Sequence, residues 1–305
     1  MAAPKIKILI GPSSFGEISQ EALRLLDTSG FKIIANPYKR KYTKQELIRL
    51  LGQDVPGIIA GLEPLDQEVF VKTKLKVISR CGSGMSNVDV KSAKAYNIKV
   101  YSTPDAPTNA VAELTLGAMI SLLRMLPLMD RELHDGHWGK KSGRELRGKS
   151  VAIIGFGRIG RKLAELLKPF DVKILAVDPM LKKKTNCVKV VALEQALRQA
   201  DIISLHLSGE QEIIGADELK LVKPGIFLLN AARGGLINEA ALIQALDDKR
   251  VTGVWLDTFS LEPYTGELTK YPQVILTPHI GSYTVECRNV MELEAAQNLI
   301  KGFRG

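Results

Sequence analysis

The segment Val151-Ala-Ile-Ile-Gly-Phe-Gly-Arg-Ile-Gly160 limits the possible folds of this chain more than any other part of its sequence. Four apolar residues precede three glycines, and a stretch rich in leucine and alanine follows, which predicts a buried strand, a tight turn and a helix. Gly155 permits the turn, Gly157 lets the backbone approach a diphosphate, and Gly160 lets the helix pack on the strand. The segment therefore predicts a dinucleotide-binding unit with the diphosphate at the helix N-terminus.

The residue that ends the next predicted strand points to the identity of the dinucleotide. Asp178 follows Lys173–Val177, at close to the spacing of about 20 residues that is typical of this motif. A carboxylate there accepts hydrogen bonds from a ribose 2′-hydroxyl and repels a 2′-phosphate, so we expect NAD rather than NADP. Arg158 is expected to add a charge-assisted contact. The alternative is an ordinary turn aspartate before Pro179.

Apolar runs of strand length alternate with periodic stretches of helix length, which predicts an α/β protein with parallel sheets. We expect two Rossmann-like doubly wound domains with an active site in the cleft between them. The substrate domain, flavodoxin-like, is expected at 1–102 and completed by a helix at 286–305, and the NAD-binding domain at 103–285. Expected strands are Ile6–Ile10, Gly57–Ala60, Val77–Ser79, Lys99–Tyr101, Ser150–Ile154, Lys173–Val177, Ile202–His206, Ile226–Asn230, Val251–Leu256 and Val274–Leu276. Expected helices are Ile18–Asp27, Thr43–Leu51, Asn109 to about Leu133, Arg158–Lys168, Leu193–Gln199, Ala216–Val222, Glu239–Asp248 and Val285–Phe303.

Composition excludes several classes of function. The net charge of +9 is spread along the chain apart from Lys182-Lys183-Lys184, and no nucleic-acid motif accompanies it, so we expect an anion-binding site and no nucleic-acid partner. The cysteines Cys81, Cys187 and Cys287 are far apart, which favours a reducing, cytoplasmic setting without disulfides or a metal site. No apolar run approaches the length of about 18 residues that a membrane span needs.

Three later segments carry a polar residue just beyond a predicted strand, where ligands bind in open parallel sheets. Arg233 offers a planar fork for a substrate carboxylate. His279 can exchange a proton with a carbonyl or hydroxyl group, and Glu262 can orient its imidazole. Taken singly, these residues are equally well explained as a surface ion-pair member, a loop histidine and a solvated turn acid.

Further motifs in the same order give the chain a family resemblance over nearly its whole length. They are Arg80-Cys-Gly-Ser-Gly-Met-Ser-Asn-Val-Asp89, Thr108-Asn-Ala-Val-Ala-Glu113 and Glu145-Leu-Arg-Gly-Lys149. With the segments above, they resemble the D-2-hydroxyacid dehydrogenase family, and most of all its phosphoglycerate dehydrogenase-type members. The resemblance implies reversible, NAD-dependent oxidation of an R-configured 2-hydroxy acid to a 2-keto acid by a homodimer. Because the chain ends at Gly305, the C-terminal regulatory domain of longer members, and serine feedback through it, are not expected.

The resemblance also implies roles for individual residues. Arg233 matches the substrate-orienting arginine, Glu262 the acid that supports the histidine, and His279 the acid/base histidine. Substrate contacts are implied for Arg80, Gly82, Ser83, Gly84, Arg233 and His279, with loop amides receiving the substrate carboxylate. Cofactor contacts are implied for Gly155, Phe156, Gly157, Arg158, Ile159, Gly160 and Asp178, and at the nicotinamide half for Thr103, Leu207, Ala231, Asp257, Ile280, Gly281 and Ser282.

The substrate is the least determined part of this prediction. Arg80 matches an arginine that approaches the substrate phosphate in phosphoglycerate dehydrogenases, so we expect 3-phosphoglycerate and a place in serine biosynthesis; the alternative for Arg80 is a structural ion pair. Alternative enzymes are a glyoxylate/hydroxypyruvate reductase or a D-lactate dehydrogenase, and an alternative of another class is an NAD-sensing, corepressor-like binding protein. The chain departs from the family pattern at Ser86, Ser208 and Asn238, and in a shortened loop at 206–215.

Overall fold

The computed structural model describes residues 5–181 and 188–304, and it divides into two compact units. Unit 1 comprises Met1–Pro107 and Tyr283–Gly305, and unit 2 comprises Thr108–Ser282. The segments 103–107 and 283–285, which were expected in the NAD-binding domain, are therefore part of unit 1. Cys187 and the Lys182-Lys183-Lys184 run lie outside the described residues.

The described part of unit 1 contains one five-stranded parallel sheet in the order β2-β1-β3-β4-β5. This is the strand order of flavodoxin-like folds, which confirms the expected architecture of this part of the chain. Its strands are β1 (Ile6–Ile10), β2 (Phe31–Ile34), β3 (Gly57–Ala60), β4 (Val77–Arg80) and β5 (Lys99–Ser102).

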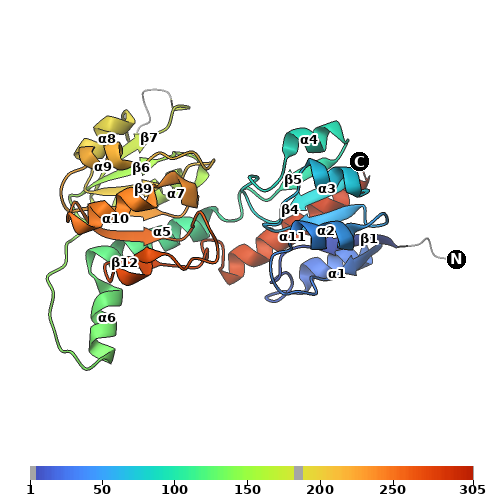
Figure 1. The fold of residues 1–305 in the computed structure, drawn as a ribbon, viewed down its shortest axis with the longest axis horizontal. Helices are drawn as coiled ribbons and strands as arrows, with labels where there is room; N and C mark the ends of the chain where they lie inside the picture. The colour runs from blue at the N-terminus through green and yellow to red at the C-terminus, as the bar shows by residue number, and fades with distance from the viewer. Residues whose placement is uncertain (1–4, 182–187, 305) are drawn as a thin grey trace. The chain divides into compact units, whose positions relative to one another are not determined.

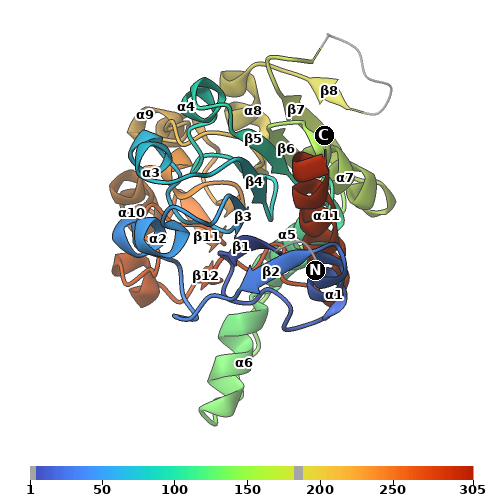
Figure 2. The same ribbon diagram turned by 90° about the vertical axis from the view of Figure 1, so that its right-hand side faces the viewer.

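Helices cover both faces of this sheet, as the fully buried strands β3 and β4 require. The helices α1 (Glu21–Thr28) and α11 (Val285–Arg304) pack on one face, and Figure 2 shows them on the opposite side of the strands from α2, α3 and α4. These last three are α2 (Lys44–Leu51), α3 (Gln67–Lys72) and α4 (Val90–Ala95). Each begins at a side-chain cap, at Thr43, Asp66 and Asp89 respectively.

The face of α11 that packs on the sheet includes an ion pair between Arg288 and Glu292. The side chains are 5% and 3% exposed, and Arg288 Nη2 lies 2.6 Å from Glu292 Oε1. Both side chains are also tied to the loop after β1: Arg288 donates to Ser14 Oγ at 3.2 Å, and the Gly16 amide donates to Glu292 Oε2 at 2.8 Å. The pair therefore fastens the last helix to the first loop of unit 1.

The described part of unit 2 contains one seven-stranded parallel sheet in the order β12-β11-β10-β9-β6-β7-β8. Figure 1 labels β12, β9, β6 and β7 of this sheet. From β8 to β11 this is the doubly wound order of dinucleotide-binding folds, so the expected fold class is confirmed. The strands are β6 (Ser150–Ile154), β7 (Lys173–Val177), β8 (Lys189–Val190), β9 (Ile202–Leu205), β10 (Ile226–Asn230), β11 (Val251–Leu256) and β12 (Val274–Leu276). The helices and short 3-10 turns are α5 (Thr108–Leu123), α6 (Leu126–His134), α7 (Arg158–Leu167), η1 (Lys168–Phe170), α8 (Leu193–Gln199), α9 (Ala216–Leu221), η2 (Gly234–Leu236), α10 (Glu239–Asp247) and η3 (Glu267–Lys270).

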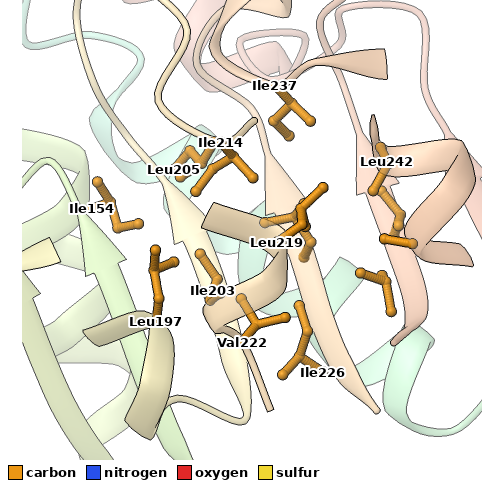
Figure 3. Packing of buried hydrophobic residues seen from close by; sticks show 14 of the residues in the cluster. Ile154, Leu197, Ile203, Leu205, Ile214, Leu219, Val222, Ile226, Ile237 and Leu242 are labelled. Atoms are coloured by element: carbon orange, nitrogen blue, oxygen red, sulfur yellow. The ribbon is translucent and has the colours of Figure 1, made fainter. Parts of the chain in front are cut away.

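Two apolar layers hold unit 2 together. One face of the sheet packs on α8, α9 and α10, and the cluster in Figure 3 includes Ile203 and Leu205 of β9 with Leu197 of α8 and Leu219 of α9. The other face packs on α5 and α7. The carboxyl ends of all these parallel strands lie at one edge of the sheet, and the loops that follow them carry the candidate site.

The single long helix expected from Asn109 to Leu133 is wrong. The chain instead forms α5 and α6, which are bent by 62° at a break where Met125 takes a positive φ of 52°. Pro127 lies in the first turn of α6, a position that suits a helix start and not a helix interior. Among the described residues, no single helix is long and apolar enough to cross a membrane, and α5 with α6 meets that test only as a bent pair.

Candidate active site

The loop between β6 and α7 contains three glycines, and each of them has a different structural setting. Gly155 has a φ of +90°, and a methyl group on it would stand 2.6 Å from the carbonyl of His206. A methyl group on Gly160 would collide with the carbonyl oxygen of Gly155. At Gly157, by contrast, a methyl group would meet nothing within 4 Å. The fold therefore needs two of the glycines, while the third lies open beside the α7 N-terminus, whose first-turn amides suit a diphosphate.

Asp178 holds this loop from the end of β7. Its Oδ2 accepts the amide of Phe156 at 2.8 Å, and its Oδ1 accepts the amide of Met180 at 2.8 Å. The expected NAD-selecting acid is thus placed next to the glycine loop. Arg161, which was not predicted, fixes the other side of the loop, because its Nε donates to the Phe156 carbonyl at 3.0 Å.

The loop after β10 presents Arg233. Asn230, which is 1% exposed, donates from Nδ2 to the Arg233 carbonyl at 2.8 Å and accepts the Ala232 amide at 3.0 Å. Gly234 follows with so little space that a methyl group on it would collide with the backbone of Phe259. Asn230 and Gly234 thus fix the backbone conformation of the loop that carries the half-buried Arg233. The sequence alone did not single out these two residues.

Glu262 and His279 meet across two loops of unit 2. His279 Nδ1 lies 3.2 Å and 3.1 Å from the two carboxylate oxygens of Glu262. Glu262 Oε1 also accepts the Phe259 amide at 3.1 Å. The contact leaves Nε2 as the other nitrogen of the ring, and the His279 side chain is 37% exposed, so the ring can exchange protons with a bound molecule.

Asp257 anchors the loop that carries His279. Its Oδ1 accepts the Thr277 hydroxyl at 2.6 Å and the Ile280 amide at 2.9 Å, and its Oδ2 accepts the Gly281 amide at 2.8 Å. Burial raises the pKa of Asp257, and the hydrogen bonds oppose that rise. The sequence predicted this residue as a cofactor contact, and the structure adds that it holds the Thr277 side chain before His279 and the backbone amides of Ile280 and Gly281 after it.

In unit 1, Thr103 is bound to the expected substrate loop. Its hydroxyl accepts the Gly82 amide at 2.8 Å, and its own amide donates to the Gly82 carbonyl at 3.1 Å. The Gly82 amide is therefore engaged within unit 1, whereas Ser83 is exposed and Gly84 half-buried. Arg80 is 8% exposed, and its Nη1 donates to the carbonyl of Cys81.

The remaining predicted positions lie at the same edge of the unit 2 sheet, on loops or in the first turn of α7. Leu207 follows β9, and its amide nitrogen is 2.8 Å from where a methyl group on Gly155 would stand. Other half-buried residues at this edge are Ile159, Ala231, Ile280 and Ser282. Arg158, at the start of α7, is exposed.

His206 is a half-buried titratable residue that the sequence did not mark as part of the site. Burial lowers its pKa to about 4. Its Nε2 lies 2.8 Å from Ser204 Oγ, and its amide donates to the Ile154 carbonyl at 2.7 Å, directly before the glycine loop. A neutral imidazole therefore stands beside the dinucleotide motif.

One departure from the family pattern has a local explanation. Asn238 caps α10 by accepting the Ala241 amide at 3.0 Å, and its Nδ2 donates to Glu212 at 3.0 Å. An aspartate would serve the first contact but repel Glu212. The shortened loop and Asn238 are therefore matched to each other. Within the described ranges, His, Cys, Asp and Glu side chains form no group of three or more that could hold a metal ion.

Comparison with known proteins identifies the class to which this fold and site belong. Residues 116–281 match the family model described as D-isomer specific 2-hydroxyacid dehydrogenase, NAD binding domain. The chain is 32% identical to hydroxypyruvate reductase of Thermotoga maritima, over 90% of this chain and 95% of that protein. It is 31% identical to D-3-phosphoglycerate dehydrogenase of Archaeoglobus fulgidus, over 94% of this chain and 56% of that protein. The crystal structure of a glyoxylate reductase from Paecilomyes thermophila superposes with a TM-score of 0.85 at 30% identity, covering 97% of this chain and 94% of that one.

The chain belongs to the D-isomer specific 2-hydroxyacid dehydrogenase family, which confirms the resemblance. Unit 2 is the NAD-binding domain, and the open space at Gly157, the α7 N-terminus and the Asp178 carboxylate fit a dinucleotide. The chain is an NAD-dependent oxidoreductase that acts on a D-2-hydroxy acid or its keto acid. Its relatives carry different substrate names, so the particular acid is a separate question.

Proposed function

We propose that this enzyme oxidises 3-phosphoglycerate to 3-phosphohydroxypyruvate with NAD, in serine biosynthesis. The chemistry rests on one observation, the contact of His279 Nδ1 with the Glu262 carboxylate in a loop fastened by Asp257. The phosphorylated substrate is supported by Arg80, which ends β4 directly before the Gly82–Gly84 loop.

His279 acts as the acid/base residue in this proposal. In the oxidation, its Nε2 takes the proton of the substrate 2-hydroxyl group, while bound NAD supplies the hydride acceptor. The Glu262 carboxylate stabilises the imidazolium that forms, because it lies against Nδ1. In the reduction, the same nitrogen returns the proton to the carbonyl oxygen.

Arg233 orients the substrate in this proposal. Its guanidinium fork matches a carboxylate and also polarises the neighbouring 2-oxygen. The amides of Ser83 and Gly84 are proposed as further carboxylate donors, and Gly82 shapes their loop because its own amide is held by Thr103.

Reduction of glyoxylate or hydroxypyruvate is the second candidate, and the burial and internal hydrogen bond of the Arg80 side chain favour it. The side chain is 8% exposed and donates to the Cys81 carbonyl, so part of its binding capacity is used within unit 1. Two sets of initial rates separate the candidates. The oxidation is measured with NAD and 3-phosphoglycerate, D-glycerate or D-lactate, and the reduction with NADH and glyoxylate or hydroxypyruvate. Strong activity on the unphosphorylated acids without activity on 3-phosphoglycerate would reject the first proposal.

The NAD-sensing binding protein is separated from an enzyme by Arg233→Ala. For an enzyme we expect turnover to fall at least a hundredfold with an unchanged Kd for NADH, because Arg233 is proposed to bind substrate and not cofactor. The exposed Arg198→Ala in the same unit is the matched control, and its turnover should stay near that of the wild type. A wild type that binds NADH but turns over no acid of the panel would favour the binding protein.

A homodimer is proposed through α5 and α6. No residue of α6 is buried in the described structure, and Leu126 and Leu133 are 48% and 55% exposed. Figure 1 shows α6 projecting away from the unit 2 sheet. Light scattering of the wild type and of Leu126→Asp/Leu133→Asp tests the proposal: we expect a dimer that becomes a monomer, and a monomeric wild type would reject it.

A further inference from the structure

Tyr264 joins the loop that carries Glu262 to helix α10. Its hydroxyl group donates to Glu239 Oε1 at 2.7 Å and accepts the Leu268 amide at 3.2 Å. Glu239 is the first residue of α10, and Leu268 lies in η3. Burial, together with the hydrogen bond to Glu239, raises the pKa of Tyr264 to about 12, so the hydroxyl group keeps its proton and remains a donor. Two hydrogen bonds therefore fix the outer end of the Tyr264 ring.

The ring of Tyr264 is stacked on the ring of Phe259. The ring centroids are 4.4 Å apart, and the angle between the ring planes is 21°. Both side chains pack against the apolar layer that lies between the unit 2 sheet and α8, α9 and α10. Aromatic pairs of this kind stabilise a structure beyond the burial of their area. The position of the Tyr264 ring therefore helps to set the position of Phe259.

Phe259 is in contact with both loops that carry the polar side chains of the site. Its amide donates to Glu262 Oε1 at 3.1 Å, and the same oxygen lies 3.2 Å from His279 Nδ1. Its backbone also adjoins the Arg233 loop, because a methyl group on Gly234 would collide with the Phe259 carbonyl carbon. A shift of the Phe259 backbone would therefore disturb the contact between Glu262 and His279.

We propose that Tyr264 is a positioning residue for the reaction, which acts through Phe259 to hold the Glu262 carboxylate against the His279 imidazole. The inference rests on the proposed function, in which His279 exchanges a proton with the substrate and Glu262 supports it. Acid/base catalysis depends on the placement of the group that transfers the proton. Loosening Tyr264 therefore lowers kcat, whereas the binding of the dinucleotide at the glycine loop is unaffected.

Two substitutions of Tyr264 test this proposal in steps. Tyr264→Phe keeps the stacked ring and removes both hydrogen bonds of the hydroxyl group, whereas Tyr264→Leu removes the aromatic contact as well. We expect kcat to fall about threefold in Tyr264→Phe and about tenfold or more in Tyr264→Leu, with an unchanged KM for NADH. A normal kcat in Tyr264→Leu, or a raised KM for NADH as the main effect, would overturn the proposal.

Tyr271→Phe is the matched control, because the Tyr271 hydroxyl group donates to Asp247 Oδ1 at 3.0 Å at the last residue of α10. It removes the same kind of hydrogen bond from the other end of the same helix and should leave kcat unchanged. In a Glu262→Ala background, Tyr264→Leu should no longer lower kcat, because its effect passes through the Glu262 carboxylate. A fall as large as that of Tyr264→Leu in either experiment would show that Tyr264 does not act through Glu262.

The ring of His279 provides a readout that does not depend on turnover. The chain has four histidines, so the ring signals of His279 in a proton–nitrogen NMR spectrum can be assigned with His279→Gln. These signals report the hydrogen bond at Nδ1, so they should move in Tyr264→Leu and stay in place in Tyr271→Phe. Unmoved signals would overturn the coupling, and Tyr264→Phe answers the same question if Tyr264→Leu folds poorly. A wild type inactive on every hydroxy acid would instead reject the proposed function and leave this coupling measurable.

Discussion

The amide of Phe156 donates a hydrogen bond to the carboxylate of Asp178, with 2.8 Å between Phe156 N and Asp178 Oδ2. The acid expected to select NAD is therefore also a brace for the glycine loop. Asp178→Asn keeps one oxygen acceptor and removes the charge that repels a 2′-phosphate. We expect the preference for NAD over NADP, measured as the ratio of the two kcat/KM values, to fall about tenfold or more.

The control for this variant is Asp217→Asn, an exposed acid of the same unit that pairs with Lys220. It removes an equal charge and should leave the cofactor preference unchanged. An unchanged preference in Asp178→Asn would mean that the carboxylate serves only to brace the loop.

Two glycines of one loop should respond to alanine in opposite ways. Gly157→Ala should keep the melting temperature of the wild type, because the new methyl group meets nothing within 4 Å, but it should weaken NADH binding at least tenfold by filling the space proposed for the diphosphate. Gly155→Ala should instead lower the stability, because its φ is +90° and the methyl group would stand 2.6 Å from the His206 carbonyl. Thermal unfolding and NADH fluorescence titration check both. Normal NADH affinity in Gly157→Ala would place the diphosphate elsewhere.

Asp257→Asn should disable the loop that carries His279. An asparagine would direct its NH2 group at the Ile280 amide, the Gly281 amide or the Thr277 hydroxyl, and leaving one such group unsatisfied costs about 1–3 kcal/mol. We expect kcat to fall about a hundredfold, with a smaller change in KM for NAD. Thr277→Val removes one of these partners and should have a weaker effect. A raised KM for NAD with a normal kcat would show instead that Asp257 acts mainly on the cofactor.

His206 should make the protein sensitive to acid. Its pKa is about 4 in the folded protein and about 6.5 in an unfolded chain, so the unfolded state binds more protons between these values. The contribution of the neutral ring is present above pH 6.5 and is lost as the pH falls towards 4, by up to about 3 kcal/mol. Urea unfolding at pH 7.5, 6 and 5 should show a smaller loss for His206→Gln than for the wild type. The exposed His137→Gln should lose as much stability as the wild type, and an equal loss in all three proteins would contradict the prediction.

The sequence predicted the strands of the described unit 2 other than β8, and it marked the candidate glycine loop, because each is a local signal. Glycines at 155, 157 and 160 mark a turn, and apolar runs mark buried strands. The same reasoning missed β2, β8, α3 and α4, which are too short to show a clear period. It also joined α5 to α6, although Pro127 was a visible sign of a new helix start.

Other parts of the site depend on tertiary contacts and leave no local pattern. The hydrogen bond from the Gly281 amide to the Asp257 carboxylate joins residues 24 positions apart. Thr103 was expected in the NAD-binding domain, but it is hydrogen-bonded to Gly82 and belongs to unit 1. The sequence did not single out Glu63, whose burial depends on the space that Gly11 leaves for its carboxyl group.

The buried pair of Arg288 and Glu292 limits how this sequence can change during evolution. Losing either partner leaves an uncompensated charge in the core of unit 1, at a cost of about 3–5 kcal/mol, which is a large share of the stability of a typical domain. Replacing both with apolar residues is far less costly. Descendants of this sequence are therefore expected to keep the two residues together or exchange them together, and lineages carrying only one of them should be rare.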